Sequence, residues 1–239
     1  MSDDLERFLM TQPATADRPL QGKTVLVVED SRFASEAIRL LCLRSGARIR
    51  RADTLASAHR HLRVYRPSIV IVDMGLPDGS GADLIRELAA ETARVPVILA
   101  ISGDDGAHSL AMKAGADGFM TKPLESLAIF QKTVLELLPV GEGPTGPRKV
   151  PSEMIEPDQM ALQDDLSHMA EIMNAEPNSH EIEYIAQFLN GVALSAHDEK
   201  LKAAAEQLGR TGPADSNLRR RFDRVAGMVN ERLAERRAL

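Results

Sequence analysis

Apolar residues in the first 138 positions form two alternating patterns. Short runs rich in β-branched residues are typical of strands buried on both faces of a parallel sheet, and they are joined by stretches with the three-and-four spacing of helices. The predicted strands are 24–28, 47–51, 69–72, 95–101 and 117–120, and the predicted helices are 33–42, 54–65, 82–90, 107–114 and 124–138. This alternation predicts an α/β fold with one five-stranded, doubly wound parallel sheet.

The pattern changes after residue 139, where Gly and Pro dominate a short segment and only helical spacing follows. We expect a flexible N-terminal arm over 1–21, a sheet domain over 22–139, a linker with nothing to pack over 140–156, and an all-α hairpin or bundle over 157–239. The predicted C-terminal helices are 157–174, 179–208 and 214–239. Because each carries an apolar stripe that must be covered, a second copy of the chain is one candidate partner for these helices.

Composition narrows the classes of function. The chain has 239 residues, a net charge of -6, no Trp and 3% aromatic residues, which argues against a broad nucleic-acid surface. The single cysteine, Cys42, falls within an apolar helical stretch, so we expect an inert buried thiol. There is no apolar run of about 18 residues and the first residues are acidic, which predicts a cytoplasmic protein without a membrane segment.

Acidic, hydroxyl and lysine side chains follow the predicted strands at their carboxyl ends. In a parallel sheet these ends lie at one edge. The first strand ends at Glu29 and Asp30, the third at Asp73, the fourth at Ser102 and the fifth at Lys122. Three carboxylates at one edge repel one another unless a cation lies among them, and a hard divalent ion such as Mg²⁺ suits oxygen ligands. A carboxylate beside a lysine, a hydroxyl and Mg²⁺ is typical of a phosphoryl site in which the carboxylate is the nucleophile.

Each of these residues also has a structural interpretation. Asp73 could be a satisfied structural acid, Lys122 a solvated lysine, Ser102 a cap for the following turn, and the Glu29-Asp30 pair a cap for the next helix. The structural interpretations of Lys122, Ser102 and the acidic pair, together with that of Phe119 as a core residue, would all have to hold for the site to be lost.

Residues 23–138 resemble the receiver domain of two-component response regulators, which has a flavodoxin-like fold. The resemblance is carried by the acidic pair Glu29-Asp30, by Ser102 with Gly103 after it, and by two longer stretches, V-D-M-G-L-P-D-G-S-G from Val72 and A-D-G-F-M-T-K-P from Ala116.

The resemblance implies a role for each of these residues. Asp73 would accept a phosphoryl group from a phosphohistidine on a sensor histidine kinase or a histidine phosphotransfer protein. Mg²⁺ would be bound by Asp30, Asp73 and the backbone carbonyl of Gly75, with Glu29 acting mainly through water. Lys122 would contact the phosphoryl oxygens, while Ser102 and Phe119 would form the switch. An aromatic residue such as Phe119 is more often part of the core, and its place three residues before Lys122 favours the switch.

The C-terminal helices leave three interpretations open. In the first, they form a binding or dimerisation module switched by the receiver, whose own chemistry is limited to self-phosphorylation and slow autodephosphorylation. In the second, the protein is a phosphorelay protein that passes the group to one of the exposed helical histidines His168, His180 and His197. In the third, it is a DNA-binding transcription regulator, for which the arginines of the last helix are the candidates.

Overall fold

The computed structural model describes residues 13–104, 106–210 and 217–237. The described residues divide into two compact units. Unit 1 holds the residues up to Asp30 together with Ser35–Glu156, and unit 2 holds Ser31–Ala34 together with the residues from Pro157 onward.

Unit 1 is built on a five-stranded parallel sheet with strand order β2-β1-β3-β6-β7, which is the predicted doubly wound flavodoxin-like order. The strands are β1 (Thr24–Val28), β2 (Arg48–Ala52), β3 (Ile69–Asp73), β6 (Val97–Ser102) and β7 (Gly118–Thr121). Every residue of β3 and β6 is buried, as the unbroken apolar runs indicate.

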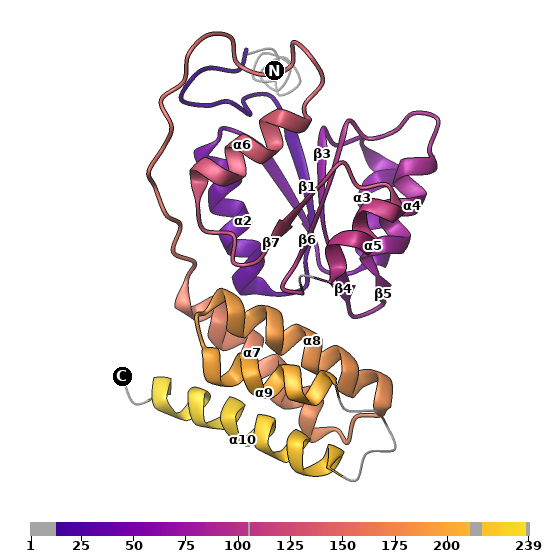
Figure 1. Cartoon of the computed structure of the whole chain (residues 1–239), viewed down its shortest axis with the longest axis vertical. Coiled ribbons are helices and arrows are strands. Elements are labelled where there is room, and N and C mark those ends of the chain that lie inside the picture. The colour runs from indigo at the N-terminus through magenta and orange to yellow at the C-terminus, as the bar shows by residue number, and fades with distance from the viewer. Residues whose placement is uncertain (1–12, 105, 211–216, 238–239) are drawn as a thin grey trace. The chain divides into compact units, whose positions relative to one another are not determined.

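Helices cover both faces of this sheet (Figure 1). Helices α2 (Arg32–Arg44) and α6 (Leu127–Leu137) pack on one face, and α3 (Leu55–Val64), α4 (Gly81–Ala90) and α5 (Ala107–Ala114) pack on the other. Cys42 is fully buried in the first of these two cores, where burial raises the pKa of its thiol to about 12. The expectation of an inert thiol agrees with this environment.

Three local predictions for unit 1 differ from the structure. Residues 75–80, whose glycines, proline and aspartate are typical of a turn, include a small antiparallel hairpin of β4 (Gly75–Leu76) and β5 (Gly79–Ser80). Helix α6 begins at Leu127 and not at 124, because the Ser126 side chain caps it by accepting from the Ile129 N–H. The predicted arm over 1–21 is packed in part, since Leu20 is fully buried and its N–H donates to the Ser45 carbonyl at 2.8 Å; residues 1–12 lie outside the described residues.

Unit 2 is a helical bundle, as expected for the C-terminal part. Its helices are α7 (Gln159–Asn174), α8 (Ser179–Ser195), α9 (Glu199–Gly209) and α10 (Leu218–Arg237), which share one apolar core (Figure 1). The prediction of one helix over 179–208 is wrong, because the chain breaks between α8 and α9, where His197 adopts a left-handed φ of 54° and Asp198 caps α9 by accepting from Leu201. Residues 214–216, the predicted start of the last helix, lie outside the described residues.

Two carboxylates hold unit 2 together beyond its apolar core. Asp165 on α7 is 3% exposed and accepts from the Ser31 hydroxyl at 2.7 Å, the Arg32 N–H at 2.8 Å and the Phe33 N–H at 3.0 Å. Asp198 accepts from Arg232 of α10 at 2.6 and 3.2 Å, which fastens α10 to the turn between α8 and α9.

Candidate functional site

The three predicted carboxylates come together at one end of the sheet. Glu29 and Asp30 directly follow β1, Asp73 is the last residue of β3, and the parallel register pairs Val28 with Val72. One carboxylate oxygen from each of Glu29, Asp30 and Asp73 lies within 4.8 Å of the others. Glu29 is fully buried, Asp73 is 7% exposed and Asp30 is half-buried, so the cluster opens to solvent mainly on the Asp30 side.

Lys122 supplies the positive charge of this cluster. It follows β7, and its buried Nζ lies 2.7 Å from Glu29 Oε2 and 3.1 Å from Asp73 Oδ1. Burial alone would lower the pKa of Lys122, but the Asp73 and Glu29 carboxylates outweigh it and raise the pKa above its usual range. The side chain therefore stays an ammonium at neutral pH.

The pKa of the Asp73 carboxyl lies near neutral pH. Burial raises its pKa to about 7, the nearby Lys122 ammonium opposes this rise, and the Glu29 carboxylate adds to it. The Gly75 N–H donates to Asp73 Oδ2 at 3.3 Å, which favours the charged form. A cation placed among the three carboxylates would favour full ionisation of Asp73.

Ser102 is the last residue of β6, and its backbone lies beside the backbone of Lys122 in space. Its carbonyl accepts from the Lys122 N–H at 2.8 Å, and its hydroxyl accepts from the Asp104 N–H at 3.0 Å. The hydroxyl thus makes the turn-capping contact of the structural interpretation, while the strand places the residue at the same sheet edge as Asp73.

Phe119 in β7 is half-buried and packs against the core on the α3, α4 and α5 side of the sheet. Its ring meets that of His108 edge to face, with 5.3 Å between the centroids. This contact with a helix of the domain surface is compatible with both interpretations of Phe119, as core residue and as switch.

Gly81 is a residue that the sequence reasoning missed at this site. A Cβ at Gly81 would lie 2.0 Å from the carbonyl oxygen of Asp73, so only glycine lets the first residue of α4 approach the end of β3. Asp78 is a second, since its carboxylate accepts from the Leu55 and Ala56 N–H groups at the start of α3. Both residues belong to the stretch V-D-M-G-L-P-D-G-S-G, whose local signal indicates a turn but does not predict these contacts.

Residues 25–133 match the model of one protein family, whose description is "Response regulator receiver domain". Residues 25–133 are a receiver domain. The KDP operon transcriptional regulatory protein KdpE of Escherichia coli is 32% identical to this chain over 99 residues, which cover 41% of this chain and 44% of KdpE. The probable transcriptional regulatory protein TcrX of Mycobacterium tuberculosis is 31% identical over 138 residues, which cover 56% of this chain and 59% of TcrX.

A solved structure of a putative response regulator from Chloroflexus aurantiacus is similar to part of the chain. It is 25% identical, covers 48% of this chain and 96% of its own, and superposes with a TM-score of 0.46. None of the helices that the structure describes combines the length and the hydrophobicity that a membrane span requires.

The donor set of the receiver domain fits the predicted Mg²⁺. Three carboxylates with oxygens within 4.8 Å of one another offer the hard ligands that Mg²⁺ prefers, and half-buried Asp30 leaves a side open for water. Asp30 and Asp73 would hold the ion, Glu29 would support it from its buried position, and the Gly75 carbonyl remains a predicted ligand.

Within the part of the chain that the structure describes, the histidines of unit 2 belong to no candidate metal-binding group. His168 on α7 and His180 on α8 are exposed, as predicted, but His197 lies between two helices and not on one. On α10, Arg219, Arg220 and Arg224 are exposed, and Arg219 pairs with Asp223 at 3.0 Å. An arginine paired with an acidic residue one turn away on the same helix is typical of a salt-bridged helix surface.

Proposed function

We propose that the receiver domain accepts a phosphoryl group on Asp73 from a phosphohistidine of a sensor histidine kinase or a histidine phosphotransfer protein. The supporting observation is the position of the Asp73 carboxylate, which lies 3.1 Å from the Lys122 ammonium and within one cluster with the Glu29 and Asp30 carboxylates. Mg²⁺, when bound, neutralises negative charge between these carboxylates and the incoming phosphoryl group.

The chain's own groups account for the transfer. A carboxylate oxygen of Asp73 attacks phosphorus, the P–N bond to the donor imidazole breaks with its electron pair going to nitrogen, and an acyl phosphate forms on Asp73. The Lys122 ammonium, already 2.7 Å from Glu29, stabilises the negative charge of the phosphoryl oxygens. Ser102, at the end of the adjacent strand β6, would exchange its contact with the Asp104 N–H for one with the phosphoryl group.

This chemistry modifies the protein itself and does not turn over a diffusible substrate. We expect self-phosphorylation from a small phosphodonor and slow autodephosphorylation, with the modified domain switching the helical module of unit 2.

Labelling with acetyl phosphate and Mg²⁺ tests this function. The wild-type chain should take up acid-stable, base-labile phosphate, and the Asp73→Asn variant should take up none. Uptake by Asp73→Asn at the wild-type rate would contradict the proposal. Acid-labile phosphate on His168, His180 or His197 would instead identify a phosphorelay protein.

Transcription regulation is a second candidate function, favoured by the names of the relatives KdpE and TcrX. The matched residues span about half the length of these relatives, so regulation of transcription is a proposal for this chain. A salt-dependent shift of promoter DNA by the phosphorylated full chain, weakened by Arg220→Gln and Arg224→Gln together, would support this candidate.

A further inference from the structure

The chain after α6 does not leave unit 1 as a free linker, because it runs back to the start of α6. Here residues 148–155 are called the strap. The Ile155 N–H donates to the Glu125 carbonyl at 2.8 Å, the Leu127 N–H donates to the Glu153 carbonyl at 3.2 Å, and Met154 forms an antiparallel β-bridge with Ser126. The expectation that 140–156 has nothing to pack is therefore wrong for its last residues.

Side chains fix the strap at both ends. At its end, Ile155 is 4% exposed and belongs to the core that includes Leu124 and Leu127, and Glu153 pairs with Arg44 of α2 at 2.9 Å. At its start, Arg148 donates to the side chain of buried Gln131 on α6.

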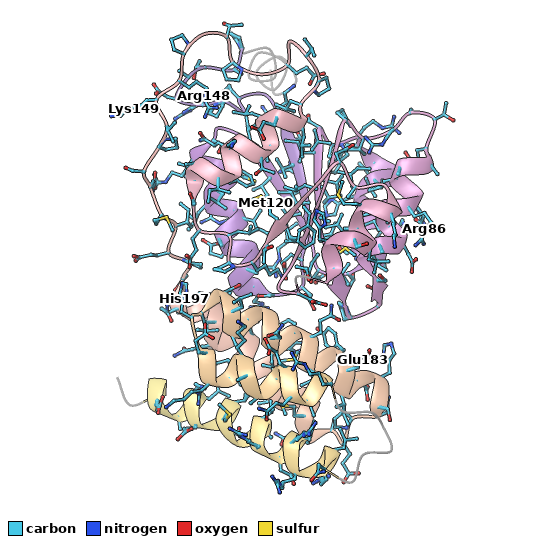
Figure 2. The ribbon with its side chains drawn as sticks, viewed as in Figure 1. Arg86, Met120, Arg148, Lys149, Glu183 and His197 are labelled. Carbon is cyan, nitrogen blue, oxygen red and sulfur yellow. The ribbon has the colours of Figure 1, made fainter. Side chains whose placement is uncertain are left out.

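The middle of the strap is loosely packed. A pocket of about 430 Å³ lies between α6 and the strap, lined by Ile129, Lys132 and Leu135 on the helix and by residues 148–151 on the strap. Val150 is 75% exposed, and Figure 2 shows Arg148 and Lys149 on this segment. The strap is thus a lightly held segment with two anchors, and such segments open more easily than the core.

The anchor at Ile155 lies on the loop that carries the site lysine. Glu125, which accepts from Ile155, is three residues after Lys122, and the Lys122 N–H is itself bonded to the Ser102 carbonyl. Any shift of Lys122 and Ser102 toward a phosphoryl group on Asp73 therefore acts on the segment that holds the strap. On its C-terminal side the strap leads into α7, which begins at Gln159, four residues after Ile155.

We infer that the strap is the output connection of the receiver domain. Phosphorylation of Asp73 changes the hydrogen bonds between loop 122–127 and residues 153–155, and the strap passes this change along the chain to α7. The inference rests on the proposed phosphorylation of Asp73 and adds the route by which its signal leaves the domain.

Hydrogen exchange of the full chain tests the route, with Mg²⁺ alone compared with Mg²⁺ and beryllofluoride as the phosphoryl mimic. The Ile155 and Leu127 amides should change exchange rate by about threefold or more when the mimic binds. A change at Asp73 and Ser102 without a change at Ile155 or Leu127 would overturn the strap inference and leave the proposed function standing. No change at any of these positions would overturn both.

Substitutions in the strap test whether it transmits the signal without disturbing the receiver domain itself. Ile155→Ala should keep phosphorylation of Asp73 but lose the exchange change in α7, whereas Val150→Ala, an exposed position of the same strap, should keep both. Glu153→Gln removes the ion pair with Arg44 without touching the core and should reduce the change in α7. A full response of α7 in both Ile155→Ala and Glu153→Gln would contradict the inference.

Discussion

Asp73 stands in an environment that opposes its own charge. Burial raises the pKa of its carboxyl to about 7, while Lys122 holds it from rising further. The same burial limits the access of water to the carboxylate, which lies 3.1 Å from the Lys122 ammonium. The environment that makes the Asp73 carboxylate reactive therefore also lowers the stability of the metal-free domain, because the folded state disfavours its charged form.

Magnesium affinity should depend on pH through this group. Because protons compete with Mg²⁺ for Asp73, the apparent affinity of the full chain should rise from pH 5.5 through about 7 and level off about one pH unit higher, where the carboxyl is ionised. Calorimetric titration at several pH values measures this, which suits a chain without Trp. An affinity that stays constant across this range would contradict the assignment.

Lys122 should be essential for the stability of the metal-free protein. Lys122→Gln leaves buried Glu29 and Asp73 without their ammonium, so the free energy of unfolding in EDTA should fall by about 3 kcal/mol at pH 7.5. Denaturant titration gives the value. Lys132→Gln is the matched control: its side chain is 76% exposed, and we expect a change below about 0.5 kcal/mol. Equal effects of the two variants would argue against the buried pair.

At the scale of the elements, two carboxylates of unit 2 join segments that are far apart in the chain. Asp165 accepts from the Ser31 hydroxyl and from the Arg32 and Phe33 N–H groups, which belong to the same unit, and Asp198 both caps α9 and binds Arg232 of α10. Polar contacts of this kind stabilise unit 2 in addition to its apolar core.

Loss of the Asp165 carboxylate should lower the free energy of unfolding. Asp165→Ala leaves three donors at residues 31–33 without this acceptor, and we expect the free energy of unfolding to fall by about 1–3 kcal/mol. The neighbouring Asp164→Ala removes only an exposed pair with Arg32 and should cost less than about 0.5 kcal/mol. Chemical denaturation of both variants makes the comparison, and similar losses would refute the role of Asp165.

The Asp198–Arg232 pair should make unit 2 sensitive to acid. The hydrogen bonds from Arg232 lower the pKa of Asp198, so its contribution is present above the unfolded value of about 3.9 and is lost as pH falls through the lower folded value. Arg232→Gln should therefore reduce the free energy of unfolding at pH 7 by about 1–2 kcal/mol. The difference from wild type should shrink near pH 2; a constant difference would count against this pair.

Local sequence predicted the elements and the site far better than it predicted the long-range contacts. The run Ile69–Val72 ending in Asp73 could be read directly, because a buried strand and the turn after it have strong local signals. Asp165 could not be assigned, since its partner Ser31 is 134 positions away and an aspartate within a helix is ordinarily solvated. The break at His197 was hidden because apolar spacing continues across it, although Asp198 followed by Glu199 was an available capping signal.

At the scale of the whole molecule, the stripes that suggested a partner are already covered. Val225 and Val229 of α10 are fully buried within the core of unit 2. Dimerisation through the C-terminal helices remains a prediction, but it would have to use other faces of these helices.

The unmodified full chain should therefore sediment as a monomer at low micromolar concentration. Any dimer should appear only with Mg²⁺ and beryllofluoride, because only the phosphoryl mimic alters the receiver. Analytical ultracentrifugation with and without the mimic measures both states. A dimer of equal stability under both conditions would show that another surface drives association.

The lone thiol of this chain, Cys42, is sealed inside the sheet domain and is protonated at every pH in ordinary use. A cysteine introduced at exposed Val150 would consequently be the single reactive sulfur of the protein. Fluorescent or spin labels that react with thiols would therefore attach only to the introduced cysteine. Movements of the segment after α6 can then be followed without first replacing Cys42.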